Sequence, residues 1–551
     1  MTNKKIIQGT IKSAFTGFPI ADVKINLVDN NEKIIDSTYS GKKGYWSVNV
    51  DERISKIIFE KKDYVTKQLS IDNGFPVVIR LLEDSLIGYL DKLWYRPGET
   101  LKAFIHSGHP FQAKLIRHGI ESKVINILGE YPSVNQNVPN GYFVTDGLSW
   151  SQTLDFIIPA DLDSGLYSIN LNCNNTSQSY SMSFVVAPSL QDCGKSARIL
   201  VLASTNNWQT YNIWGGRSRY RNFETSQPNK LKSNLRALGL RFVPETIKAF
   251  IKKSLGSKAI LSIKDHPNSF QFKRLSIKRP HPNCSISDES VENSFTSHLA
   301  AGEWRILAWL EREGHKYDLI SGFQLNKNPE ILSKYDVFIL STHCEYWTKQ
   351  MFSGLKEFYK NGGSILNLSG NSIYREVEFY EDGSLHCVSL RFSETAEDET
   401  KLIGVRFDMR GYGTCAPYKV VNPDHWVFNE TNLKKGDVFA TKSLNRSMSG
   451  KDKDDFNKNP ASNPGLAPLT GDGGSGWETD KITQSAPKDI TVLAKGTNKL
   501  RGGSDMIIRE AESGNLMFSA SSITFGGSLL IDSSCSILVN NVLKRALGKQ
   551  S

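Results

Sequence analysis

Short, predominantly apolar runs bounded by turn residues recur along the chain from about residue 195 onward. Four of them, at 199–202, 337–340, 364–368 and 516–520, are typical of strands buried on both faces of a parallel sheet. Apolar residues return at helical spacing in 299–310, 348–359 and 533–547. This alternation predicts a doubly wound parallel α/β domain over residues 195–551.

The region before residue 190 shows period-two alternation broken by Gly and Asn turns, clearest in 7–11, 19–27 and 44–48. It predicts a small β-sandwich over residues 1–84, which resembles the transthyretin-like carboxypeptidase-regulatory module. A second, Ig-like sandwich is expected over residues 85–190. His106, His109 and His118 fall within it, but their spacing fits no metal-ligand pattern, so we expect them at the surface.

The composition suits a soluble, multidomain protein. A chain of 551 residues is too long for one hydrophobic core and predicts about three domains. No apolar run approaches the roughly 20 residues that a membrane helix needs, and the start lacks the apolar core of a signal peptide. We therefore expect a cytoplasmic protein without a membrane partner. The seven cysteines are scattered and form no CxxC pair, which argues against disulfides and a zinc knuckle.

A formal net charge of +10 raises the question of a nucleic-acid partner. The basic residues are dispersed and no nucleic-acid motif is present. The densest basic stretches, 230–241 and 248–264, are better explained as solvated faces of one insertion, so we expect no nucleic-acid partner. The polar segment at about 440–475 is expected to be a long surface loop, either a lid or solvated filler.

Two of the predicted strands end in chemically rich segments. The strand at 337–340 is followed by Ser-Thr-His-Cys-Glu-Tyr-Trp, and the strand at 199–202 leads into the aromatic and glycine-rich turn 211–220. Open α/β sheets bind ligands just outside the carboxyl ends of their strands. Phenolate and carboxylate are hard oxygen donors suited to iron, and a bound iron polarises a carbonyl and lowers the pKa of water. The segments therefore indicate metal-assisted hydrolysis of an amide.

Several motifs, in order along the chain, resemble the large subunit of N,N-dimethylformamidase. They are Tyr211-Asn212-x-Trp214-Gly215-Gly216-x-Ser218-x-Tyr220, Arg279-Pro280, His343-x-Glu345-Tyr346-Trp347, Gly370-Asn371, Gly476-Trp477-Glu478-x-Asp480 and Phe518-Ser519-Ala520. The resemblance implies a glutamine-amidotransferase-like α/β domain with a mononuclear iron, Fe³⁺ or Fe²⁺, held by two tyrosines and one glutamate. It also implies a small-molecule amide substrate and a small accessory subunit, although this chain could instead work alone or as a homo-oligomer.

The implied metal ligands fall on few positions. The glutamate is Glu345, and one tyrosine is Tyr211 or Tyr220, which the spacing does not separate. The second family tyrosine follows the Arg-Pro pair, where this chain has His281. Either the His281 imidazole replaces a phenolate, or the metal site is lost and the protein is a noncatalytic relative.

Three further residues have implied catalytic roles. His343 is expected beside the metal as an acid, a base or a hydrogen-bond donor, and Asn371 is expected to orient the substrate or oxyanion. Glu478 resembles the second carboxylate, which acts on the attacking water. A family lysine after Asn371 has no clear counterpart, and Arg391 and Lys401 are candidates.

The expected function is an iron-dependent hydrolase of small linear amides of formamide or N-acyl type. Two alternatives remain open. One is a noncatalytic protein that docks a glycan or protein partner, with Glu345 only at a helix N-terminus and the tyrosines 211 and 220 only in an aromatic cluster. The other is a deacylase or deformylase of an N-acylated sugar, motivated by the N-terminal sandwich.

Overall fold

The computed structural model describes residues 5–71, 75–141, 143–220, 222, 272–286, 290–292, 298–445 and 471–548. The protein is multidomain and built mostly of β-sheets, with 37% of residues in strands and 19% in helices. The basic stretches at 230–241 and 248–264 lie outside the described residues, as does most of the 440–475 segment.

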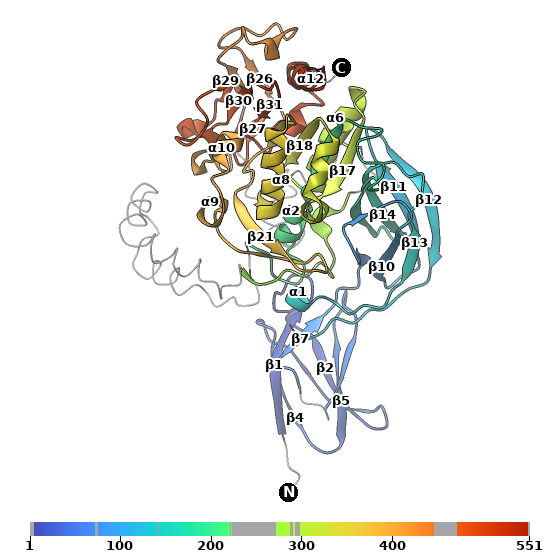
Figure 1. Ribbon diagram of the computed structural model, residues 1–551. Coiled ribbons are helices and arrows are strands. Elements are labelled where there is room, and N and C mark those ends of the chain that lie inside the picture. The colour runs from blue at the N-terminus through green and yellow to red at the C-terminus, as the bar shows by residue number, and fades with distance from the viewer. Residues whose placement is uncertain are drawn as a thin grey trace, which may run out of the picture.

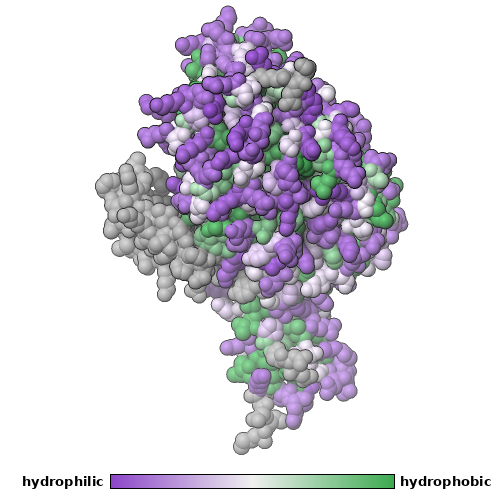
Figure 2. Space-filling view, viewed as in Figure 1, coloured by the Kyte–Doolittle hydropathy of each residue, from purple (hydrophilic) through white to green (hydrophobic). Residues whose placement is uncertain are grey.

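The N-terminal strands form two small sheets that enclose their own core. The strands are β1 (Lys5–Ser13), β2 (Lys24–Asp29), β3 (Ile34–Tyr39), β4 (Tyr45–Val50), β5 (Ile54–Glu60), β6 (Lys67–Ser70) and β7 (Val78–Leu81). They pair in the orders β4-β1-β7 and β3-β2-β5-β6 around Trp46, Phe59 and neighbouring aliphatic residues. Figure 1 shows this unit projecting from the rest of the molecule. Hydrophobic residues are prominent on its visible face, whereas the visible face of the main body is largely hydrophilic (Figure 2).

A second pair of sheets follows, beside the C-terminal domain (Figure 1). Its elements are β8 (Ile87–Leu90), β9 (Trp94–Tyr95), β10 (Thr100–His106), β11 (Phe111–His118), β12 (Ser122–Tyr131), α1 (Phe143–Asp146), β13 (Leu154–Ile157), β14 (Gly165–Cys173) and β15 (Ser179–Val186). The sheet orders are β13-β10-β8 and β12-β11-β14-β15-β9. The surface prediction is wrong for His106 and His118, which are fully buried. They face inward at the ends of β10 and β11, and the ring nitrogens of His118 are hydrogen-bonded to Ser122 and Ser168.

The C-terminal domain is built on a nine-stranded mixed sheet in the order β17-β16-β18-β20-β31-β30-β29-β25-β26. The strands are β16 (Ile199–Ala203), β17 (Tyr317–Ser321), β18 (Val337–Thr342), β20 (Ser364–Ser369), β25 (Tyr418–Val420), β26 (Val438–Phe439), β29 (Ile490–Gly496), β30 (Asp505–Glu510) and β31 (Leu516–Ser519). The strands β17, β16, β18, β20 and β31 are parallel to one another. The remaining four are antiparallel, so the prediction of a fully parallel sheet holds only for the half where helices alternate with strands.

The five main helices are α2 (Thr205–Tyr211), α6 (Ala300–Arg312), α7 (Gly322–Lys327), α8 (Lys349–Lys360) and α12 (Ser533–Leu547). Three of them, α6, α8 and α12, begin and end close to their predicted positions, whereas α2 and α7 were not predicted. Side chains immediately before α8 and α12 cap them: Thr348 accepts from the Met351 N–H at 3.1 Å, and Asp532 accepts from the Cys535 N–H at 3.0 Å. These caps fix where the two helices begin.

Shorter elements connect the main ones. The strands are β19 (Tyr346–Trp347), β21 (Arg375–Phe379), β22 (Leu385–Cys387), β23 (Val405–Phe407), β24 (Cys415–Ala416), β27 (Ser475–Gly476) and β28 (Asp480–Ile482). The helices are α9 (Phe392–Thr395) and α10 (Thr400–Ile403), with 3-10 turns η4 (Pro282–Cys284), η5 (Pro329–Lys334), η6 (Met409–Gly411), η7 (Trp426–Phe428), η8 (Lys499–Arg501) and η9 (Phe525–Ser528). Within the described ranges no helix is both long and apolar enough to cross a membrane. All seven cysteines are buried thiols.

Candidate functional site

The five parallel strands have the chain order 2-1-3-4-5, in which the first strand lies between the second and the third. The connections from β16 and β18 therefore leave in opposite directions, and a crevice opens between their carboxyl ends. Such switch points are where open α/β sheets bind ligands. Here α2 follows β16, and the segment of His343 and Glu345 follows β18.

The turn after α2 brings Tyr211 and Tyr220 together. Tyr211 is the last residue of α2, and a sharp turn at Gly215 and Gly216 returns the chain, both glycines having positive φ (95° and 84°). A Cβ on Gly215 would collide with the side chains of Val144 and Phe143. The turn is also held by the buried Arg279, whose Nη1 donates to the Trp214 carbonyl at 2.7 Å. The two phenol rings lie 4.8 Å apart between centroids.

Glu345 is fully buried at the centre of the site. The Tyr220 hydroxyl donates to both of its carboxylate oxygens at 2.7 Å, and the Tyr211 hydroxyl donates to Oε2 at 3.0 Å. The Arg375 Nε donates to Oε1 at 2.6 Å. Tyr346 completes the cluster, since its hydroxyl donates to that of Tyr220 at 2.6 Å. Three side chains from two separate segments thus converge on one carboxylate, and Tyr346 contacts one of them.

His343 is oriented by the backbone of the neighbouring strand. Thr342 pairs with Ser369 across β18 and β20, and Thr342 has φ = 53°, a strained value for a β-branched residue. The His343 Nδ1 then lies 2.9 Å from the Gly370 carbonyl, to which it must donate. Its Nε2 faces the Tyr211 hydroxyl at 2.9 Å, with carboxylate oxygens of Glu345 and Glu478 at 3.4 and 3.6 Å.

Asn371 and Glu478 form the side of the site beyond β20. The Asn371 Nδ2 donates to Glu478 Oε2 at 2.8 Å, and its backbone N–H donates to Asp480 Oδ1 at 2.8 Å. Asn371 has φ = 52°, which asparagine tolerates better than most residues. Gly370 permits this close approach, because a Cβ there would collide with the Glu478 carbonyl.

Burial and neighbouring charges set the protonation states. Burial raises the pKa of Glu345, but Arg375 and His343 outweigh it and hold the pKa at about 2. Burial, reinforced by the Glu345 charge, raises the pKa of both Tyr211 and Tyr220. Glu478 has its pKa raised by burial and by Glu345, against the opposing effect of His343. One carboxylate is therefore fixed in its charged form and the second holds a proton more readily.

The donor set fits a small, hard cation. The hydroxyl oxygens of Tyr211 and Tyr220 lie 3.4 Å apart, and both lie within 3.0 Å of Glu345 Oε2. Neighbouring ligands on one ion are about 3 Å apart when each bond is about 2 Å long. Ligand atoms of His343, Glu345 and Glu478 also lie within 4.8 Å of one another.

His281 has a side-chain Nε2 without a hydrogen-bond partner among the described residues. Its backbone N–H donates to the Tyr180 hydroxyl on β15 at 3.1 Å, at the start of η4. Its side chain is buried, burial lowers its pKa to about 3, and within the described residues no hydrogen bond or ion pair joins it to Glu345 or either tyrosine. Both Tyr211 and Tyr220 reach Glu345, so one turn brings two phenols to this carboxylate.

Two residues near the cluster escaped sequence reasoning. Arg375, at the start of β21, is the cation paired with Glu345, whereas Arg391 and Lys401 make no hydrogen bond or ion pair to the cluster in the described parts of the chain. His298 is 3% exposed and packs against Trp477 and Tyr211 with ring centroids 4.6 and 4.9 Å away. Neither of its ring nitrogens has a hydrogen-bond partner among the described residues. The only sequence signal for His298 is its position just before an apolar helix.

Comparison with known protein families shows to which family this chain belongs. The family described as "N,N-dimethylformamidase beta subunit-like, C-terminal" matches residues 113–536. The chain belongs to this family. The matched region contains all the residues of the cluster around Glu345, and it begins inside the second pair of sheets.

Individual relatives of this dimethylformamidase-like protein are distant. N,N-dimethylformamidase beta subunits from an Alcaligenes species and from Paracoccus aminophilus are 23% and 22% identical over 238 and 239 residues, which is 43% of this chain in each case. The matched region spans 29% of each relative's length. Among solved structures, an mmIFT52 N-terminal domain covers 45% of this chain, and the chain covers 91% of that domain, at 11% identity with a TM-score of 0.25.

Proposed function

We propose that this protein is a metal-dependent hydrolase that cleaves a small linear amide of formamide or N-acyl type. The convergence of the Tyr211, Tyr220 and Glu345 oxygens carries the proposal. Two phenolates and one carboxylate provide three anionic oxygen donors, which suit mononuclear iron better than softer metals. When bound, such an ion supplies polarisation of the amide carbonyl and lowers the pKa of a coordinated water.

The other residues of the cluster have separate tasks in this proposal. Glu478, with a pKa raised by burial, accepts the proton of the attacking water and passes it on towards the leaving nitrogen. His343 is held by the Gly370 carbonyl and directs Nε2 at the reacting group. The Asn371 Oδ1 is buried without a partner among the described residues, so it can accept a hydrogen bond from the leaving amine once its nitrogen is protonated.

Burial of the cluster favours a small substrate. His343 and Glu345 are 0% exposed and Asn371 is 3% exposed, so a bulky sugar cannot reach them in this conformation. A formamide or short N-acyl compound matches this enclosure better than an N-acylated sugar. His298, a neutral imidazole beside Tyr211, is the further group that we assign to substrate contact.

The fold and assembly extend the proposal. The five parallel strands in 2-1-3-4-5 order support a glutamine-amidotransferase-like domain. The curated relatives are beta subunits by name, which supports an accessory subunit for this chain too. Copurification with an expressed partner, or a homo-oligomer by light scattering, distinguishes the two assemblies.

Metal analysis combined with an amide screen tests the function. We expect about one equivalent of iron in the purified protein and release of amine from N,N-dimethylformamide or a related formamide. Glu345→Gln, which removes one anionic donor, should lose both. Tyr359→Phe is the matched control, because Tyr359 is a buried tyrosine whose hydroxyl has no partner in the described chain.

Correctly folded protein without metal, and without activity after iron is added, would instead support the noncatalytic alternative. Activity on N-acylated sugars but not on formamides would move the substrate to the deacylase class. Retention of metal and activity by Glu345→Gln would contradict the assigned site.

A further inference from the structure

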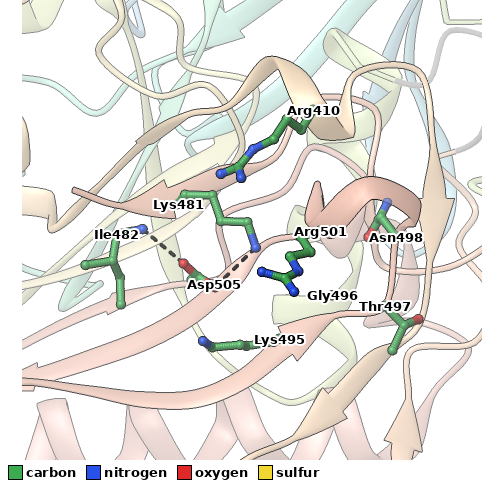
Figure 3. A pocket seen from close by; sticks show the side chains of 9 residues that line it. All are labelled: Arg410, Lys481, Ile482, Lys495, Gly496, Thr497, Asn498, Arg501 and Asp505. Atoms are coloured by element: carbon green, nitrogen blue, oxygen red, sulfur yellow. Dashed lines mark hydrogen bonds and ion pairs between the residues drawn. The ribbon is translucent and has the colours of Figure 1, made fainter.

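A cavity of about 510 Å³ lies on the antiparallel side of the C-terminal domain, apart from the Glu345 cluster. Figure 3 shows the side chains that line it. They come from η6, β28, the end of β29, η8 and the start of β30: Arg410, Lys481, Ile482, Lys495, Gly496, Thr497, Asn498, Arg501 and Asp505. Four of these elements follow one another along residues 480–510, and η6 joins them from a distant part of the chain.

The lining is strongly cationic. The lining has four basic side chains and one carboxylate, Asp505; Arg410 is paired with Asp408 outside the lining, and both oxygens of Asp505 are already used. Its Oδ1 accepts from the Lys481 ammonium at 3.3 Å and its Oδ2 accepts from the Ile482 N–H at 3.1 Å (Figure 3). Within the described residues, Lys495 and Arg501 have no carboxylate partner. The cavity thus retains uncompensated positive charge.

The loop that carries Arg501 is held in place. Leu500 and Arg501 have φ values of 58° and 57°, which cost energy in residues other than glycine. Asn498 anchors the loop, since its Nδ2 donates to Thr414 Oγ1 at 2.8 Å and to the Ser475 carbonyl at 3.0 Å. The anchored loop thus presents the solvent-exposed Arg501 beside the other basic side chains of the lining.

The wall of the cavity that carries Arg410 is also held by contacts within the protein. Two donors of Arg410, Nε and Nη2, are held by Asp408, with the Nη2 to Oδ2 distance at 2.6 Å. A Cβ on Gly411 would collide with the Gly502 carbonyl, so η6 and η8 pack backbone to backbone. The backbone positions that carry Arg410 and Arg501 are therefore held next to each other.

We propose that this cavity binds a phosphate-type dianion, either inorganic phosphate or the phosphate group of a small phosphomonoester. Guanidinium and ammonium groups together match several phosphate oxygens, and arginine does so with paired N–H donors. The cavity is larger than a phosphate ion, which leaves room for the rest of a small phosphorylated molecule. A nucleic acid would need a longer basic track than these four side chains supply.

Strand β28 contributes residues both to this cavity and to the surroundings of the Glu345 cluster. In β28, Asp480 faces Asn371 while Lys481 lines the cavity, because successive residues of a strand point to opposite sides. Thr479, between Glu478 and Asp480, donates through Oγ1 to the Gly502 carbonyl at 2.6 Å. Binding here is independent of the proposed hydrolase activity and is tested without it.

Isothermal titration of the full chain with inorganic phosphate and with glycerol 2-phosphate tests the proposal. We expect binding to wild type with a dissociation constant below about 1 mM at moderate salt, and binding at least about tenfold weaker in Lys495→Gln/Arg501→Gln. The control Lys488→Gln/Lys499→Gln removes the same charge from exposed positions outside the lining and should bind like wild type.

The outcomes separate clearly. Tighter binding of glycerol 2-phosphate than of phosphate identifies a phosphorylated small molecule as the ligand, and equal binding identifies free phosphate. No binding to wild type, equal loss in the control variant, or binding of a single-stranded oligonucleotide without binding of phosphate would each overturn the proposal.

Discussion

The hydroxyl of Tyr220 lies 2.7 Å from both carboxylate oxygens of Glu345, although 125 residues separate them in the sequence. Tyr211 reaches the same carboxylate from the end of α2. The two phenols and the carboxylate therefore form one donor set, and the short turn between the tyrosines creates it.

Tyr220→Phe should lose bound iron, whereas His281→Ala should keep it. The first change removes an oxygen donor 2.7 Å from Glu345, and the second removes a side chain that no hydrogen bond joins to the cluster in the described structure. We expect iron content in Tyr220→Phe to fall at least about tenfold. Elemental analysis of both purified variants measures this. Loss of iron in His281→Ala with retention in Tyr220→Phe would identify His281, and not Tyr220, as a metal ligand.

Arg375→Gln should destabilise the protein by about 3 kcal/mol, because it leaves the buried Glu345 charge without its cation. Denaturant unfolding of the metal-free protein measures the loss. Arg509→Gln, which breaks the more exposed pair with Asp489, should cost less than about 1 kcal/mol. Equal effects of the two substitutions would mean that Arg375 does not compensate Glu345.

Asp480→Asn should make thermal stability less dependent on pH. Burial raises the pKa of Asp480 to about 8 in the folded protein, from an ordinary value of 3.8. The folded state therefore binds this proton more tightly than the unfolded state does. The stability that this proton binding contributes is lost as the pH rises from about 4 to about 8. Asparagine keeps an acceptor for the Asn371 N–H without ionising.

Melting temperatures from pH 4 to pH 9 measure this difference, with the exposed Asp489→Asn as control. The melting temperature of Asp480→Asn should increase relative to that of wild type as the pH rises. Parallel curves for wild type and Asp480→Asn would show that Asp480 is ionised throughout.

His298→Phe should reduce kcat/KM for a formamide at least about tenfold while leaving iron content unchanged. Phenylalanine preserves the ring contacts with Trp477 and Tyr211 but removes both nitrogens. Stability should not fall, because those nitrogens have no protein partner among the described residues. Steady-state kinetics and elemental analysis of the same preparation measure both effects. Full activity would limit His298 to packing.

Much of the framework could be predicted from local pattern. The helix expected at 533–547 is α12 itself, and the runs at 199–202 and 337–340 lie within β16 and β18. The antiparallel half of the sheet was missed, because short strands such as β25 and β26 carry too few residues to show a period.

The sequence by itself determined which chemical groups follow the buried strands, because apolar periodicity and turn residues are local properties. It therefore placed Tyr211, His343, Glu345 and Asn371 at strand ends. Only the tertiary structure decided that Tyr220 joins Tyr211 at Glu345 and that Arg375 neutralises that carboxylate. Such convergence depends on strand order and on the path of each turn, which no local pattern of residues specifies.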